Sequence, residues 1–181
     1  STPYSLDPYG YIHVPWFGVS EPQAGTFGST EIGDVTGDSR DDLVVLAHVV
    51  STDAISEILV YAQTPDHTLA LPKRYPLTIG TAHCTAMGDF NEDGVQDVLV
   101  TGQTDYTVLL SDRVEGFRVV ARPIYQPIEI AQIVPPLVTQ VDDDQHLDLV
   151  FFLSRTHAGS SSPTTDTHSR LLVMYGDGLG G

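Results

Sequence analysis

The sequence predicts an all-β protein made of about three repeated sheets, and three observations support this prediction. An acidic motif occurs at residues 33–45, 88–100 and 139–151, so it recurs with offsets of about 55 and 51 residues. Each copy is followed by short apolar runs that are bounded by turn residues. No apolar pattern of helical period persists for more than about two turns, and 16 Gly and 12 Pro interrupt the chain throughout.

The composition indicates a folded and strongly acidic protein. The chain of 181 residues is long enough for one sizeable core or for several small repeated units. It is 41% hydrophobic and 18% charged, which is typical of a globular protein. With 24 acidic and 8 basic residues its formal charge is −16, so nucleic acids and anionic membranes are poor partners. No apolar stretch is long enough for a membrane insertion.

The first copy illustrates the predicted order of elements. A segment punctuated by glycine and proline, residues 19–32, leads into the first acidic motif. The apolar runs 42–50 and 56–62 that follow are predicted strands, and residues 68–77 are a predicted outer strand. Residues 9–17, "YGYIHVPWF", also have the pattern of an outer strand, placed before the first motif.

Copies two and three repeat this order, and each period has room for about four short strands, the size of one β-propeller blade. The corresponding segments are 75–87, 97–102 and 106–112 in copy two, and 122–138, 148–154 and 170–176 in copy three. We therefore expect a single domain, 1–181, of four-stranded antiparallel blades over residues 17–75, 76–125 and 126–181. Copy three also contains an insertion, 154–170, whose Ser, Thr, Pro and Gly content predicts a flexible loop.

The acidic motif has the chemistry of a calcium site. Calcium takes six to eight oxygen ligands, and oxygen-bearing side chains at alternating positions of a curled loop can converge on one ion. Crowded carboxylates repel one another unless a cation lies among them. Acidic turns that only solvate hairpins are the alternative, which three copies with matching flanks make less favourable. An EF-hand requires a glutamate at position twelve, where this chain has Val45, Val100 and Phe151.

The motif G-D-[FV]-[NT]-x-D-[GS]-x-x-D-[LV]-[VL] resembles the FG-GAP or VCBS repeat, the calcium-binding blade of integrin α-subunit propellers and of many bacterial extracellular proteins. The resemblance covers about residues 28–181. It implies that loop positions 1, 3, 5, 7 and 9 bind Ca²⁺, with position 7 using its backbone carbonyl. The implied ligands are Asp34, Thr36, Asp38, Arg40 and Asp42 in loop one; Asp89, Asn91, Asp93, Val95 and Asp97 in loop two; and Gln140, Asp142, Asp144, His146 and Asp148 in loop three.

Position six of each loop is expected to adopt a left-handed backbone conformation, which suits Gly94 in loop two. Ser39 and Gln145 occupy this position in the other loops, at a cost of about 1–2 kcal/mol each. Loop three also has Gln140 in place of the first aspartate. We therefore expect up to three Ca²⁺ ions, bound most tightly by loop two and most weakly by loop three. Three divalent ions would change the formal charge from −16 to −10.

The expected function is a calcium-binding extracellular module, secreted or on the cell surface, for protein or carbohydrate recognition or adhesion. Weak calcium sites of this kind work where calcium is about millimolar. No catalytic motif is present: the seven histidines lack metal-site spacing, and Cys84 is the single cysteine. The alternatives are the propeller of a carbohydrate-active enzyme, of lyase or dehydratase type, and a purely structural domain of a larger surface protein.

Three blades are fewer than the four to eight of closed propellers. Copy three lacks the outer strand that segment 9–17 resembles, so two chains that exchange these strands could close a six-bladed homodimeric ring. The alternative is that further blades lie elsewhere in a longer chain or on a separate chain.

Overall fold

The computed structural model describes residues 5–6, 12–13, 25–49, 55–79, 82–102, 105–113, 116–123, 135–157 and 166–179. Within these ranges every regular element is a β-strand, and three antiparallel sheets account for most of them. This confirms the all-β prediction. None of the described residues form a helix that is long and apolar enough to cross a membrane.

Sheet 1 consists of β3 (Gly25–Gly33), β4 (Asp42–Val49), β5 (Ile55–Tyr61) and β6 (Lys73–Pro76), paired in chain order. Its middle strands contain many β-branched and aliphatic residues, which pack well on a pleated surface. The predicted outer strand is present as β6, which pairs with β5.

Sheet 2 has the same order, with β7 (Ala82–Gly88), β8 (Asp97–Gly102), β9 (Asp105–Ser111) and β10 (Phe117–Pro123). All six residues of β8 are buried, as are six of the seven in β9. These two strands therefore form the centre of the molecule.

Sheet 3 consists of β11 (Leu137–Thr139), β12 (Asp148–His157) and β13 (Asp166–Met174). The described residues of this sheet thus form three strands, where the sequence suggested four-stranded blades. The prediction of a loop over 154–170 was wrong at both of its ends, because β12 and β13 stay paired from Ser154↔Ser169 to His157↔Asp166. Backbone pairing tolerates the polar side chains that suggested a loop. Residues 158–165, between the two strands, lie outside the described residues.

Near the N-terminus, β1 (Ser5–Leu6) pairs with β2 (Ile12–His13) in a separate two-stranded sheet. The other residues of the predicted strand 9–17 lie outside the described residues. The exchange of this strand between two chains therefore stays a prediction.

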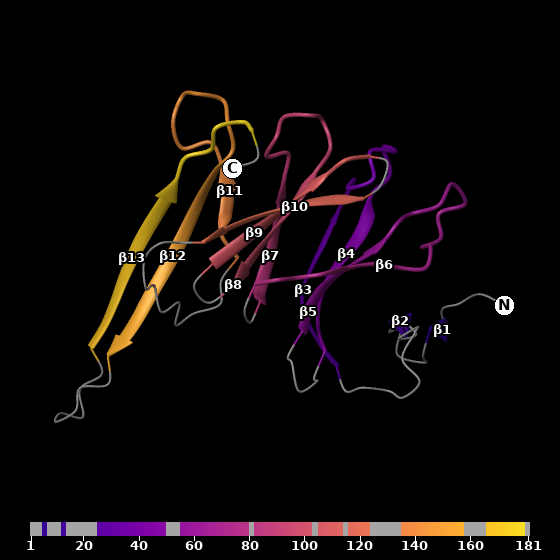
Figure 1. Ribbon diagram of the computed structural model, residues 1–181, viewed down its shortest axis with the longest axis horizontal. Helices are drawn as coiled ribbons and strands as arrows, with labels where there is room; N and C mark the ends of the chain where they lie inside the picture. Colours follow the sequence, from indigo (N-terminus) through magenta and orange to yellow (C-terminus); the bar gives the residue numbers. More distant parts are fainter. Residues whose placement is uncertain are drawn as a thin grey trace.

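The three sheets stand side by side in chain order, as Figure 1 shows, and each sheet shares an apolar core with the next. We define two faces for each sheet. The forward face carries the side chains that lie two and four residues after the last aspartate of the acidic motif. The rear face carries the side chains that lie one and three residues after this aspartate. The forward face of sheet 1 packs on the rear face of sheet 2. The contacting side chains are Val44, Leu46, Ile58 and Val60 in sheet 1 and Val98, Val100 and Leu109 in sheet 2.

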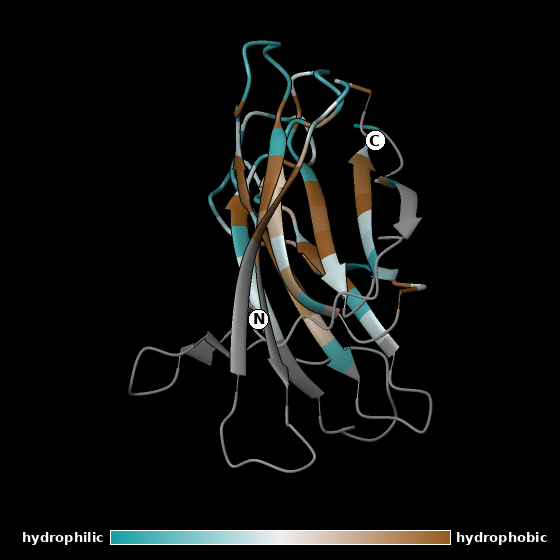
Figure 2. Cartoon of the chain, turned by 90° about the vertical axis from the view of Figure 1, so that its left-hand side faces the viewer, coloured by the Kyte–Doolittle hydropathy of each residue, from teal (hydrophilic) through white to brown (hydrophobic). Residues whose placement is uncertain are grey.

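The forward face of sheet 2 packs on the rear face of sheet 3 in the same way. The side chains involved are Leu99, Tyr106, Val108 and Leu110 in sheet 2 and Leu149, Phe151, Leu172 and Met174 in sheet 3. Figure 2 shows the hydrophobic residues along the strands and the hydrophilic ones mainly toward the loops. This repeated stacking is consistent with propeller blades, and the described residues show no closure of a ring.

Candidate metal centre

The three acidic loops join the first two strands of each sheet and lie at one end of the molecule, at the top of Figure 1. Loop one (positions 34–42) makes one hydrogen bond to the second acidic loop and one to sheet 2. The backbone N–H of Gln96 donates to the Asp34 carbonyl at 3.1 Å, and the Ser111 hydroxyl donates to the Val35 carbonyl at 2.8 Å. Loop two (89–97) contacts loop three (140–148) through an ion pair between Glu92 and His146.

The last aspartate of each loop is buried, with an exposed fraction of 1% for Asp42 and 0% for Asp97 and Asp148. One carboxylate oxygen of each aspartate accepts the N–H of the second loop residue. The other oxygen accepts an N–H from a residue at the end of the third strand of the same sheet, or just after that strand. The N···O distances are 3.2 and 2.9 Å from Val35 and Gln63 to Asp42, 2.9 and 2.8 Å from Phe90 and Ser111 to Asp97, and 2.6 and 3.0 Å from Val141 and Gly176 to Asp148.

We call these three residues the staple aspartates, because each ties the start of its loop to a segment near the end of the next strand. The sequence predicted them only as metal ligands. The distant donors Gln63, Ser111 and Gly176 were missed because a backbone N–H leaves no signal in the residue type. The Asp42 oxygen that accepts the Val35 N–H also accepts the Thr36 N–H, at 3.1 Å.

Burial and hydrogen bonding act on the staple aspartates in opposite directions. Burial raises the pKa of Asp97 to about 6, against the N–H groups of Ser111 and Phe90, which lower it. Burial likewise raises the pKa of Asp42. The pKa of Asp148 is lowered, because the N–H groups of Val141 and Gly176 favour its charged form. A cation in the loops would favour the charged form of all three.

The fifth loop position turns the chain in the same way in every copy. The carboxylates of Asp38, Asp93 and Asp144 accept the N–H of the residue two positions later, at 3.0, 2.9 and 2.9 Å. Such local hydrogen bonds stabilise a turn without neighbouring strands. The next residue has a positive φ in each loop, 64° at Ser39, 85° at Gly94 and 74° at Gln145, which confirms the predicted left-handed position.

The first loop position differs between copies. Asp34 accepts the N–H groups of Gly37, Asp38 and Ser39, and Asp89 accepts those of Asp93 and Gly94. In loop three the amide of Gln140 instead donates to the Gln145 carbonyl at 2.8 Å. The neutral side chain thus reverses the direction of this hydrogen bond.

In loop three the structure brings three predicted ligands together. One carboxylate oxygen from each of Asp142, Asp144 and Asp148 lies within 4.8 Å of the others. Oxygens on opposite sides of one Ca²⁺ ion are roughly 5 Å apart, because each Ca–O bond is about 2.3–2.6 Å. The three oxygens therefore fit within the coordination shell of one Ca²⁺ ion. Across the described part of the chain, this is the one group of three or more His, Cys, Asp or Glu side chains that converges so closely.

In loops one and two a guanidinium group lies beside the fifth position. Arg40 forms an ion pair with Asp38. Arg113, from the turn after β9, lies 3.7 Å from the Asp93 carboxylate and donates to the Asp93 carbonyl. Sequence analysis missed Arg113, because it follows the motif of its own copy by many residues. The predicted ligands of these two loops are present, but their carboxylates are not gathered as in loop three.

Loop one contains another observation that fits a cation. The Thr36 hydroxyl, a predicted ligand, is buried and interacts with the Asp42 carboxylate, whose pKa it helps to lower. Its oxygen can also accept a bound cation. The oxygen donor sets of loops one and three are therefore compatible with the calcium ions that the sequence predicts.

Part of this region matches a known protein family. Residues 34–100 match the model of the FG-GAP-like repeat. This segment is an FG-GAP-like repeat. It extends from the first aspartate of loop one to β8, so it includes loops one and two, while loop three lies beyond the match. No curated protein and no solved structure matches the chain. FG-GAP repeats typically bind Ca²⁺, which agrees with the donor sets of the loops.

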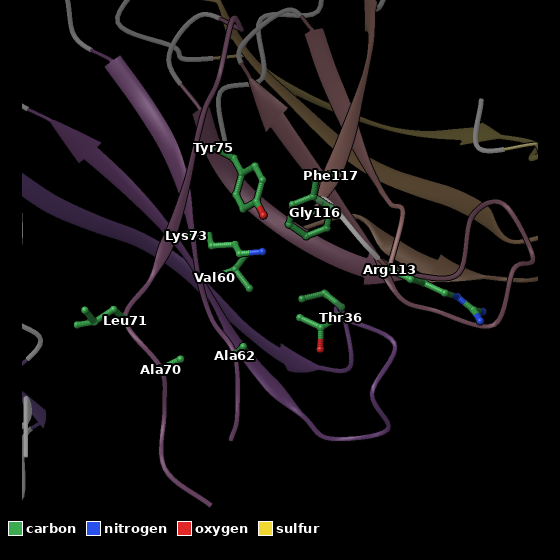
Figure 3. A pocket seen from close by; sticks show the side chains of 11 residues that line it. Thr36, Val60, Ala62, Ala70, Leu71, Lys73, Tyr75, Arg113, Gly116 and Phe117 are labelled. Atoms are coloured by element: carbon green, nitrogen blue, oxygen red, sulfur yellow. The ribbon is translucent and has the colours of Figure 1, made fainter. Parts of the chain in front are cut away.

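A cavity of about 150 Å³ lies between sheets 1 and 2 next to loop one. Its walls are mostly aliphatic, and Lys73 and Tyr75 contribute polar groups, while Figure 3 shows Arg113 extending away from them. The ring of Tyr75 packs edge-on against Phe117, with 4.9 Å between ring centroids. A cavity of this volume accommodates a group about as large as benzene.

Proposed function

We propose that this chain is a calcium-binding, extracellular β-propeller module that recognises a protein or carbohydrate ligand. The observation that carries the proposal is the convergence of the Asp142, Asp144 and Asp148 oxygens at the end of a sheet. The FG-GAP-like repeat over residues 34–100 supports it. When bound, calcium supplies positive charge that holds the acidic loops together, and no covalent chemistry is required of it.

The three loops differ in how well their carboxylates are already placed to bind calcium. In loop three the carboxylates are gathered without a guanidinium group between them, so we propose that loop three binds first. In loop one the ion pair between Asp38 and Arg40 must break before the Asp38 carboxylate can bind a metal ion. In loop two the same holds for the pair between Asp93 and Arg113. This order moves loop three from the last place of the sequence ranking to the first. That ranking counted ligand charges and the position-six glycine.

Two features support a role in recognition outside the cell. Calcium sites of this type are filled at about millimolar calcium, the extracellular range. The cavity beside Thr36 offers aliphatic walls, the Phe117 ring and the polar groups of Lys73, Tyr75 and Arg113, a lining that suits binding of a ring-shaped group. We therefore propose a binding module without catalytic activity, and product formation from a panel of polysaccharides would favour the enzyme alternative instead.

The test of metal binding is calorimetric titration of CaCl₂ into the chelator-treated full chain. We expect saturable binding, loss of the tightest site in Asp144→Asn, and loss of a weaker site in the matched variant Asp93→Asn. Circular dichroism checks that both variants are folded. Loss of the tightest site in Asp93→Asn would restore the sequence ranking, and absence of calcium binding by the folded wild-type chain would overturn the proposal.

A further inference from the structure

The cavity between sheets 1 and 2 is larger than the corresponding cavity between sheets 2 and 3. Their volumes are about 150 Å³ and about 40 Å³. Val60 lines the first cavity and Val108 the second, and each lies three residues before the backbone donor of its staple aspartate. The two cavities therefore occupy equivalent places in the repeat, and their side chains set the difference in volume.

Two small side chains keep the first cavity open. Ala62 lies directly before the donor Gln63, and the equivalent residue of sheet 2 is Leu110, which is 1% exposed and belongs to the core shared with sheet 3. The second residue of loop one is Val35, whereas that of loop two is the larger Phe90. Between sheets 1 and 2 the chain thus leaves open a space that larger side chains fill between the next two sheets.

The walls of this cavity suit a flat apolar ring. Val60, Ala62 and Ala70 supply aliphatic surface. Phe117 of sheet 2 adds an aromatic ring, which is held edge-on against Tyr75. Aromatic rings pack favourably in edge-on or offset arrangements, so a further ring can pack on this pair. A volume of about 150 Å³ is sufficient for a ring of the size of benzene.

Two hydrogen-bond donors of the lining have no partner. Lys73 and Tyr75 are two residues apart on β6, so their side chains leave the same face of the strand, and Figure 3 shows both directed into the cavity. Within the part of the chain that the structure describes, neither the Lys73 ammonium nor the Tyr75 hydroxyl has a hydrogen-bond or ion-pair partner. The guanidinium groups of Arg40, Arg74 and Arg113, by contrast, each lie beside a carboxylate.

These two donors favour an anionic group. Burial, and to a lesser degree the charge of Asp112, raises the pKa of the Tyr75 phenol, so the phenol stays protonated and can donate a hydrogen bond. A carboxylate accepts hydrogen bonds from both a phenol and an ammonium, and such charge-assisted bonds are stronger than neutral ones. The mostly aliphatic lining disfavours a sugar ring, because buried hydroxyls without partners are unfavourable.

We propose that this cavity binds a small aromatic carboxylate. The ring lies between the aliphatic wall and Phe117, and the carboxylate accepts hydrogen bonds from Lys73 and Tyr75. The inference goes beyond the proposed function and is tested separately from it, because none of these three residues belongs to an acidic loop.

The test is a nuclear magnetic resonance titration of the isotope-labelled full chain with sodium benzoate, benzamide and sodium glucuronate, at neutral pH and constant ionic strength. The amide signals of Gly116 and Phe117 report on the cavity. We expect saturable binding of benzoate, at least about threefold tighter than that of benzamide, which has the same ring without the charge. Glucuronate, which carries its carboxylate on a sugar ring, should bind more weakly than benzoate.

Variants of the lining locate the binding site. Lys73→Met should abolish the preference for benzoate over benzamide, because it removes the ammonium. The matched control is Arg118→Gln, at an exposed position next to Phe117 on the other face of β10, and it should keep this preference. Ala62→Leu introduces the side chain of the equivalent Leu110, so it should weaken benzoate binding at least about tenfold, with an unchanged or raised melting temperature.

The proposal would be overturned by a folded wild-type chain that does not bind benzoate, by equal binding of benzoate and benzamide, by tighter binding of glucuronate, or by undiminished benzoate binding in folded Ala62→Leu. Circular dichroism checks folding, and Lys73→Met decides the question if Ala62→Leu does not fold. Calcium titration of the same samples separates the two proposals. Calcium binding without benzoate binding overturns this inference alone, and benzoate binding without calcium binding overturns the proposed function alone.

Discussion

Loops two and three share one motif and one backbone turn, yet they distribute charge differently. In loop two, Asp89 accepts two loop N–H groups at 3.0 and 2.8 Å, and both Glu92 and Gly94 have positive φ. In loop three, the side-chain NH₂ of Gln140 points into the loop and donates to the Gln145 carbonyl, so Gln140 does not accept loop N–H groups there. Gln145 is the one loop-three residue with a positive φ. The first motif residue thus decides how tightly the loop backbone wraps around its own side chain.

The charges around the two loops differ as well. Arg113 lies 3.7 Å from the Asp93 carboxylate in loop two and supplies a positive charge there. In loop three the His146 side chain instead pairs with Glu92 of loop two, which raises the pKa of His146. The number of ligands therefore does not by itself determine how easily such a loop can take up a calcium ion. Side chains from neighbouring strands can pair with the same ligands instead.

The largest expected effect comes from removal of a staple aspartate in chelator. Asp97→Ala leaves the N–H groups of Phe90 and Ser111 unpaired in a fully buried site, so the free energy of unfolding should fall by about 3 kcal/mol. Asp148→Ala should lower it by about 1–2 kcal/mol, because its hydrogen bonds are only partly buried and water can replace them.

Urea unfolding measures both values, and the exposed Asp143→Ala provides the control, with a change within about 0.5 kcal/mol. Equal losses in Asp97→Ala and Asp148→Ala would contradict the difference in burial between the hydrogen bonds of the two aspartates.

The pH dependence separates the same two residues. Burial raises the pKa of Asp97 from 3.8 to about 6, so between these pH values the folded chain keeps a proton that the unfolded chain has lost. In chelator, the free energy of unfolding should therefore fall as pH rises through this window, by at most about 1.4 kcal/mol per pH unit. Asp148, whose pKa is lowered, contributes no such fall.

Unfolding curves of wild type, Asp97→Asn and Asp148→Asn across this window test the assignment. The slope should be flatter in Asp97→Asn alone. A slope that survives in Asp97→Asn would assign the effect to other groups, such as Asp42, whose pKa is also raised.

The smallest effect concerns position six. Gln145→Gly should stabilise the chain by about 1 kcal/mol, since φ is 74° there, and Gly94→Ala should destabilise it by about the same amount. A Cβ at position 94 would lie 3.4 Å from the Arg113 guanidinium, which is flexible, so backbone strain dominates that cost. Thermal unfolding measures both changes, and a neutral Gly94→Ala would show that loop two adjusts its backbone freely.

Much of the fold could be predicted from sequence, because the acidic motif marks the first hairpin of each sheet and the apolar runs that follow are strands. The extent of the β12–β13 hairpin could not, since polar residues such as Ser154 and Ser169 pair through their backbones. For the site, motif spacing located the three carboxylates that converge in loop three and the left-handed residue of each loop. It could not reveal Gln63, Ser111 or Arg113, which meet the loops only when strands far along the chain come together.

The sequence by itself determined the local geometry: alternating oxygen side chains bond to nearby N–H groups and curl each loop, whatever lies beyond it. The tertiary structure decided which carboxylates converge and which are neutralised by arginine. It also decided which sheet faces are covered. The physical reason is that burial comes from neighbouring sheets, while the backbone donors and Arg113 come from a later strand of the same sheet or the residues just after it, and no single motif encodes how these strands come together.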